Sequence, residues 1–104
     1  MKPAPSLKSA ERDAAFDDLV LALQSLREPA DLRAMLIDLC TPAELEAMAD
    51  RWQVVPLLLR GVPYRDIHQR TGVSVTTVGR VARCLTHGAG GYRKAAEQLG
   101  LHRH

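Results

Sequence analysis

The residues with the most suggestive chemistry lie in a short polar stretch of the second half of the chain. Ser74, Thr76 and Thr77 are small hydrogen-bond donors and acceptors, and arginines follow at positions 80 and 83. Hydroxyl groups can bond base edges, threonine methyls can touch thymine methyls, and arginine can bind guanine or phosphate. This combination of side chains is suited to contacts with a nucleic acid.

The charge distribution indicates the same kind of partner. Residues 1–50 hold five Lys and Arg against ten Asp and Glu, a net charge of −5, whereas residues 51–104 hold nine against two, a net charge of +7. Between Arg51 and Arg83 the only acid is Asp66. A basic half favours a polyanion partner, although segregated surface charge on an ordinary solvated protein would have the same composition.

A helix-turn-helix is predicted between Pro63 and Leu85. A helix through about Arg70 is followed by the turn Thr71-Gly72-Val73, and Ser74 then caps a second helix. Hydrophobic residues at 67, 73, 78 and 81 are expected to face the core. The predicted DNA-binding residues, on or near the first helix and along the second, are Tyr64, Arg65, Gln69, Arg70, Ser74, Val75, Thr76, Thr77, Gly79, Arg80 and Arg83. His68 lies where such motifs usually have a small residue, so either this side chain is tipped toward the edge or the interhelical angle is unusual.

The rest of the chain is predicted to be helical as well, and to form a single domain over residues 10–100. Residues 1–9, which are polar, are expected to be a disordered arm, and apolar residues at helical spacing begin near Ala10. Residues 10–61 are assigned to dimerisation, and residues 90–100 to a C-terminal helix. In the third helix, which Thr41-Pro42-Ala43-Glu44 begins and Gly61 ends, Pro56 predicts a kink.

From Leu39 onward the sequence resembles the Trp repressor family. The residues that carry the resemblance are Thr41-Pro42-Ala43-Glu44-Leu45, Ala49-Asp50-Arg51, Leu58-Leu59-Arg60-Gly61 and the run from Thr71 to Arg80. The segment from Cys84 to Tyr92 looks most like the YerC/YecD group of Trp-repressor-related proteins. The resemblance implies an all-α, six-helix protomer and a homodimer with interlocked N-terminal helices. It therefore implies a transcriptional regulator, acting as a repressor, that binds a pseudo-palindromic operator in double-stranded DNA.

The resemblance also implies an effector pocket whose ligand the sequence does not identify. The matching residues are Thr41, Arg51, Val55, Arg80 and Cys84. Val81 and Cys84 stand where the tryptophan-binding members have glycine and serine, and a valine side chain would intrude on a planar ring. We therefore expect regulation without tryptophan, with Arg51 facing phosphate or solvent and Arg80 contacting DNA.

Other functions find little support in the sequence. Cys40 and Cys84 form no CxxC motif, and His87, His102 and His104 lack the spacing of metal ligands. We expect no enzyme activity, no cofactor, no metal and no membrane segment, and a cytoplasmic location. Two alternatives to a transcriptional regulator stay open: the DNA-binding module of a transposase-type system, and a dimer whose basic face binds an acidic protein.

Overall fold

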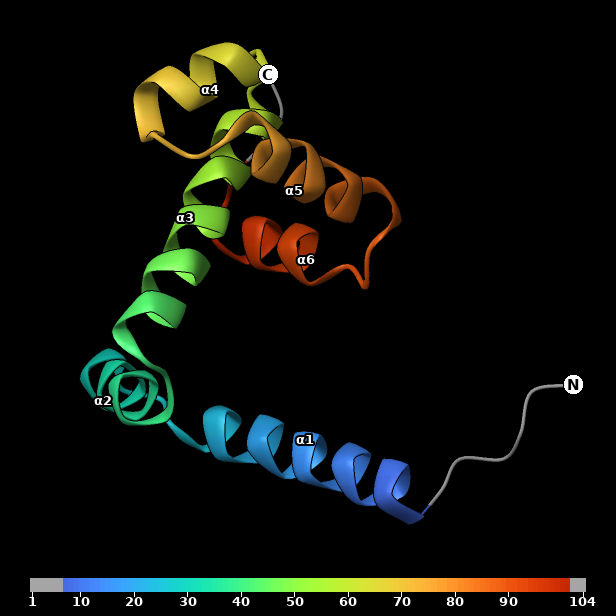
Figure 1. The fold of residues 1–104 in the computed structure, drawn as a ribbon. Helices are drawn as coiled ribbons and strands as arrows, with labels where there is room; N and C mark the ends of the chain where they lie inside the picture. The colour runs from blue at the N-terminus through green and yellow to red at the C-terminus, as the bar shows by residue number, and fades with distance from the viewer. Residues whose placement is uncertain (1–6, 102–104) are drawn as a thin grey trace, which may run out of the picture. The chain divides into compact units, whose positions relative to one another are not determined.

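The structure of the protein, a computed structural model, describes residues 7–101, and all of the regular secondary structure in this range is helical. Six helices follow one another along the chain (Figure 1). They are α1 (Leu7–Ser25), α2 (Pro29–Leu39), α3 (Pro42–Leu59), α4 (Tyr64–Thr71), α5 (Val75–His87) and α6 (Gly91–Gln98). The predicted all-α, six-helix protomer is confirmed for this part of the chain.

The first helix begins earlier than expected. Residues 7–9 belong to α1, whereas the sequence predicted a disordered arm up to residue 9. The polar residues Lys8 and Ser9 give no apolar periodicity, but they continue the helix. The rest of the predicted arm, residues 1–6, lies outside the described residues, as do His102 and His104.

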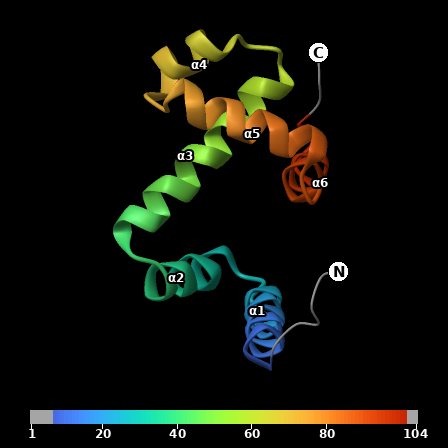
Figure 2. The same ribbon diagram turned by 45° about the vertical axis from the view of Figure 1, so that its right-hand side comes forward.

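The described helices divide into two compact units, one with α1 and α2 up to Thr41 and one that begins with α3 at Pro42. The predicted single domain of residues 10–100 therefore has an internal boundary. Within the second unit, α3 contacts α4, α5 and α6, and the assignment of residues 10–61 to dimerisation stays a prediction. Figures 1 and 2 show these three helices gathered along the C-terminal part of α3.

The hydrophobic core belongs to the second unit. Every buried residue among the described ones lies there: Val54, Val55, Ile67, Val73, Val78, Val81, Leu85 and Ala96. The predicted core positions of the helix-turn-helix, Ile67, Val73, Val78 and Val81, are thus confirmed. Full burial of a side chain of this size contributes about 1.5–3 kcal/mol, so this cluster holds α4 and α5 against α3.

Helix α3 continues through Pro56 to Leu59, and the chain then turns at Gly61. The Gly61 amide donates to the Leu58 carbonyl and the Val62 amide to the Leu57 carbonyl, each at 3.0 Å. This pair of bonds, with Gly61 at φ 78°, is a Schellman motif. The predicted helix end at Gly61 is confirmed, and the turn directs the chain into α4.

Candidate nucleic-acid interface

The turn between α4 and α5 is held by a compact set of hydrogen bonds. Gly72 adopts φ 78°, and its amide donates to the His68 carbonyl at 2.8 Å. A left-handed residue is needed there, and glycine has no Cβ to oppose it. The Thr71 hydroxyl donates to the Ile67 carbonyl at 2.7 Å and accepts from the Val73 amide at 3.1 Å. The angle between the two helices is thereby fixed by short-range bonds.

His68 has a structural part in the same turn. Its Nδ1 lies 2.8 Å from the carbonyl oxygen of Val73. Because a carbonyl only accepts, Nδ1 must carry the proton in this bond. Of the two arrangements that the sequence left open, the side chain lies at the edge, where it ties the last turn of α4 to the residue before the α5 cap. The histidine thus stabilises the turn instead of disturbing it.

Helix α5 starts with the predicted cap. The Ser74 hydroxyl oxygen accepts the amide hydrogen of Thr77 at 3.1 Å, and the same hydroxyl donates to Thr77 Oγ1 at 3.0 Å. An N-cap serine of this kind stabilises a helix by about 1 kcal/mol. Its one proton is already used within the turn, so the exposed Val75 and Thr76 beside it are better placed for contact with a ligand.

The other predicted contact residues lie at the surface of α4 and α5. Tyr64, Arg65, Gln69 and Arg70 are exposed on α4, whereas Thr77 and Gly79 are half-buried and the two arginines of α5 are exposed. Within the part of the chain that the structure describes, no carboxylate forms an ion pair with Arg65, Arg70, Arg80 or Arg83. These four guanidinium groups are therefore available to an anion from outside the chain.

Tyr64 and Arg83 flank Gly79. A Cβ built on Gly79 would lie 3.8 Å from Tyr64 Cε2 and 3.8 Å from Arg83 Nη1. Both are ordinary van der Waals distances, so the protomer itself has room for a methyl group at this position. The glycine leaves a small notch on α5 between an aromatic ring and a cation.

The residues of the predicted effector pocket differ in burial and belong to both units. Val55 is fully buried in the hydrophobic core of the second unit, and its part in an effector pocket stays a prediction. Arg51 and Cys84 are half-buried, and Arg80 is exposed. Thr41 belongs to the other unit. Val81, 1% exposed, fills a core position and not a pocket wall.

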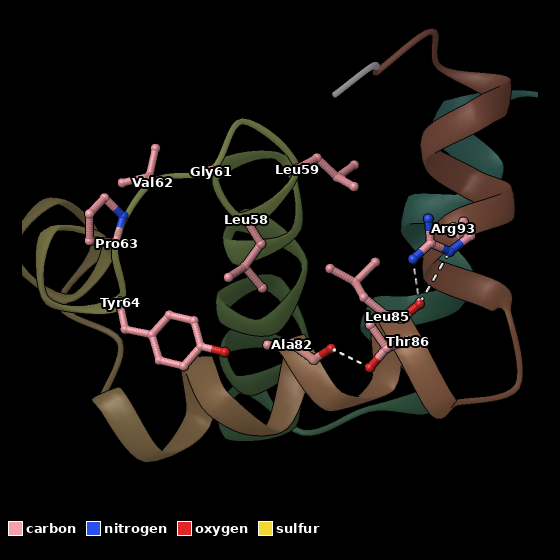
Figure 3. Close-up of a pocket in the computed structure, with 10 residues that line it drawn as sticks. All are labelled: Leu58, Leu59, Gly61, Val62, Pro63, Tyr64, Ala82, Leu85, Thr86 and Arg93. Atoms are coloured by element: carbon pink, nitrogen blue, oxygen red, sulfur yellow. Dashed lines mark hydrogen bonds between the residues drawn. The ribbon is translucent and has the colours of Figure 1, made fainter. Parts of the chain in front are cut away.

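A different pocket lies beside α5 and is lined by residues of α3, α4, α5, α6 and the loop between α3 and α4 (Figure 3). Its volume is about 370 Å³, and its lining includes none of the predicted effector residues. It is lined by Leu58, Leu59, Gly61, Val62, Pro63, Tyr64, Ala82, Leu85, Thr86 and Arg93. The Thr86 hydroxyl already donates to the carbonyls of Ala82 and Arg83, at 3.4 and 3.1 Å.

Helix α6 braces the end of α5, which sequence reasoning missed. Arg93 donates from Nε and from Nη2 to the Leu85 carbonyl, at 3.2 and 2.8 Å (Figure 3). Tyr92 packs on Trp52 of α3, with ring centroids 6.4 Å apart. The available signal was an arginine shortly after the predicted end of α5, where the helix dipole favours a cation.

Two short helices joined by a glycine turn, with a capped and basic second helix, define the class: the second unit carries a helix-turn-helix. The Trp repressor protein family matches residues 14–100. The chain belongs to this family.

Individual relatives agree with this assignment. The uncharacterized protein YerC of Bacillus subtilis (strain 168) is 33% identical over 88 residues, which are 85% of each of the two chains. A TrpR-like protein from Eubacterium eligens has a TM-score of 0.81 and 32% identity, over 88% of this chain and 94% of that one. A candidate Trp repressor from Staphylococcus aureus has a TM-score of 0.83 and 28% identity, over 96% and 100%. The predicted resemblance to a YerC-type, Trp-repressor-related protein is confirmed.

Membership of this family points to a DNA-binding regulator and not to an enzyme family. Separately, no helix within residues 7–101 is both long and apolar enough to cross a membrane.

Proposed function

We propose that this protein is a transcriptional repressor that binds a specific sequence in double-stranded DNA through α4 and α5. The observation that carries the proposal is a group of exposed arginines on the two helices of the motif that have no ion-pair partner within residues 7–101: Arg65, Arg70, Arg80 and Arg83. Helix α5 enters the major groove with its first turns at the base edges, where Val75 and Thr76 are exposed. Residues of α4 hold the phosphate backbone.

The protein acts as a homodimer that reads a pseudo-palindromic operator. In support, no described residue of α1 or α2 is buried within the chain. Phe16 and Leu21 of α1 are 65% and 63% exposed, and Ile37 of α2 is 54% exposed. Apolar side chains in this number are typical of a surface that another chain covers. Two α5 helices would then meet half-sites about 34–36 Å apart, one turn of DNA.

Repression does not require tryptophan. The position next to Arg80 is Val81, which packs in the core with Val78 and Leu85. Opening a ring-sized space there would remove a buried side chain, at a cost of about 2–5 kcal/mol for a large apolar residue and less for a valine. A small-molecule effector of another kind remains compatible with the fold.

The test is selection of binding sites from a random DNA pool, followed by anisotropy titrations of the enriched duplex and of an unrelated one over a range of salt concentrations. We expect an enriched two-fold-symmetric sequence, bound at least about 10³-fold more tightly than the unrelated duplex. Affinity that stays weak for every duplex and merely falls with salt would refute a specific regulator. Light scattering gives the oligomeric state, and calorimetry with tryptophan tests the absence of that effector.

A further inference from the structure

The C-terminal end of α5 depends on an arginine that lies outside the helix-turn-helix. In α5 the Gly88 amide bonds the Cys84 carbonyl at 2.9 Å, and the next carbonyl, that of Leu85, has no helical amide to accept. Arg93 supplies it with two donors, Nε at 3.2 Å and Nη2 at 2.8 Å. Both arms of the guanidinium fork therefore close on one backbone oxygen, as Figure 3 shows.

The helix that carries Arg93 is itself anchored. Tyr92, the preceding residue, packs on Trp52 of α3 at a centroid distance of 6.4 Å with the rings tilted by 38°. Ala96, one turn further on, is 2% exposed. Since α3 also packs on α5, the contact through Arg93 completes a ring of three helices, α3, α5 and α6. Helix α5 is thereby held at both ends: by the hydrogen bonds of the α4–α5 turn before it, and by Arg93 after it.

The local backbone leaves little freedom in this link. Gly88 ends α5, and a Cβ at this position would collide with the carbonyl oxygen of Cys84 and lie 3.0 Å from the Cys84 Cα. Gly90 adopts φ 92°, a conformation that glycine accepts without strain. These two glycines let the chain reverse within three residues, and Arg93 can then reach back eight positions to Leu85.

We propose that Arg93 is a positioning residue for DNA recognition: it sets the direction of α5 through the Leu85 carbonyl and does not contact DNA itself. The inference rests on the proposed DNA-binding function of α5. Base contacts carry the sequence information and need α5 to be correctly placed in the groove, whereas phosphate contacts are offered by every duplex. Loss of Arg93 therefore weakens binding to the selected operator more than binding to unrelated DNA.

The experiment compares Arg93→Ala, Arg93→Lys and the control Lys94→Ala in the full chain. Lys94 is the neighbouring cation of α6, its side chain is 70% exposed, and among the described residues its one ion pair is with Glu97, at 3.8 Å. Lysine at 93 can keep one hydrogen bond but not the fork. The wild type and the three variants are titrated with the selected operator and with an unrelated duplex at a temperature where thermal melts show them folded, and the salt dependence of each affinity is measured.

We expect Arg93→Ala to bind the operator about tenfold more weakly, equal to about 1.4 kcal/mol, with the salt slope of the wild type. The operator affinity of Arg93→Lys should lie between those of Arg93→Ala and the wild type, and that of Lys94→Ala should stay within about twofold of the wild type. A salt slope reduced by about 0.9 would mean that Arg93 is a phosphate contact, and this overturns the proposal. Unchanged operator affinity overturns it as well, because a purely structural role would change only the melting temperature.

Hydrogen exchange in the free protein separates this inference from the proposed function. In Arg93→Ala the amides of Thr86, His87 and Gly88 should exchange about tenfold faster, with those of the α4–α5 turn unchanged. Unaltered exchange at these amides would refute the brace whatever the protein binds. A wild type that selects no DNA sequence would instead refute the proposed function. If Arg93→Ala does not fold, Arg93→Lys carries both measurements.

Discussion

Gly79 lies in the interior of α5, although alanine is favoured over glycine in a helix by about 0.8–1.0 kcal/mol. Nothing in the protomer requires a glycine there. A methyl group at position 79 would meet Tyr64 and Arg83 at 3.8 Å each, which is ordinary contact, and Gly79 does not have a positive φ. Gly79→Ala should therefore stabilise the free protein by about 0.5–1 kcal/mol, which in a domain of this size raises Tm by about 2–8 °C.

The same substitution should weaken DNA binding. If the notch between Tyr64 and Arg83 receives the DNA backbone or a base edge, an added methyl overpacks that contact, at a typical cost of about 1–3 kcal/mol. We expect the affinity for the selected operator to fall by at least about fivefold, measured by anisotropy on the same samples as the melts. Stability and affinity would thus move in opposite directions.

Gly91→Ala is the matched control. Gly91 is the first residue of α6, it does not have a positive φ, and nothing lies within 4 Å of a Cβ built on it. The control should leave operator affinity unchanged. A lower Tm for Gly79→Ala would show that the packing argument is wrong, and a higher Tm with unchanged affinity would remove Gly79 from the DNA interface.

Three further substitutions test other parts of the motif. Ser74→Ala removes the α5 cap and should lower the unfolding free energy by about 1 kcal/mol, measured by urea denaturation; an unchanged midpoint would contradict the cap. Gly88→Ala places a Cβ against the Cys84 carbonyl, so we expect a loss of more than about 1 kcal/mol in the same assay, since backbone must shift. Arg80→Ala should cost about 1–3 kcal/mol of operator affinity and leave the oligomeric state unchanged in light scattering; a change of state would mean that Arg80 lies in the subunit interface.

The elements that could be predicted from the sequence are those that short-range chemistry determines. The spacing of Ile67, Val73, Val78 and Val81 identified the core face of the motif, and Ser74 and Gly61 marked a helix start and a helix end. Each of these depends on residues a few positions away. The turn between α4 and α5 was predicted as well, but the sequence left the interhelical angle open, and the part of His68 became clear only from its bond to the Val73 carbonyl.

The parts that could not be predicted depend on contacts between distant elements. The full burial of Val55 depends on how α3 packs against α5, and its assignment to an effector pocket, which came from the resemblance, stays a prediction. Arg93 was missed because its partner is a backbone carbonyl eight residues away, and a side chain that bonds backbone leaves no pair of complementary residues to find. The pocket beside α5 is formed by residues from four helices and the loop between α3 and α4, and it has no sequence signature.

The register of α5 separates the side chains that we propose to contact DNA from those that pack in the core. Val78, Val81 and Leu85 follow one another at helical spacing on the core side, so the side chains between them, Arg80 and Arg83, are directed outward and are exposed. Replacing an outward residue alters what the helix contacts without disturbing the core. Val81, in contrast, is a buried side chain. Position 81 can therefore either fill the core or leave room for an aromatic ring, but not both. Regulation by tryptophan would therefore have to be gained or lost through the core of the motif, while the exposed side of α5, which we propose to face DNA, stays intact.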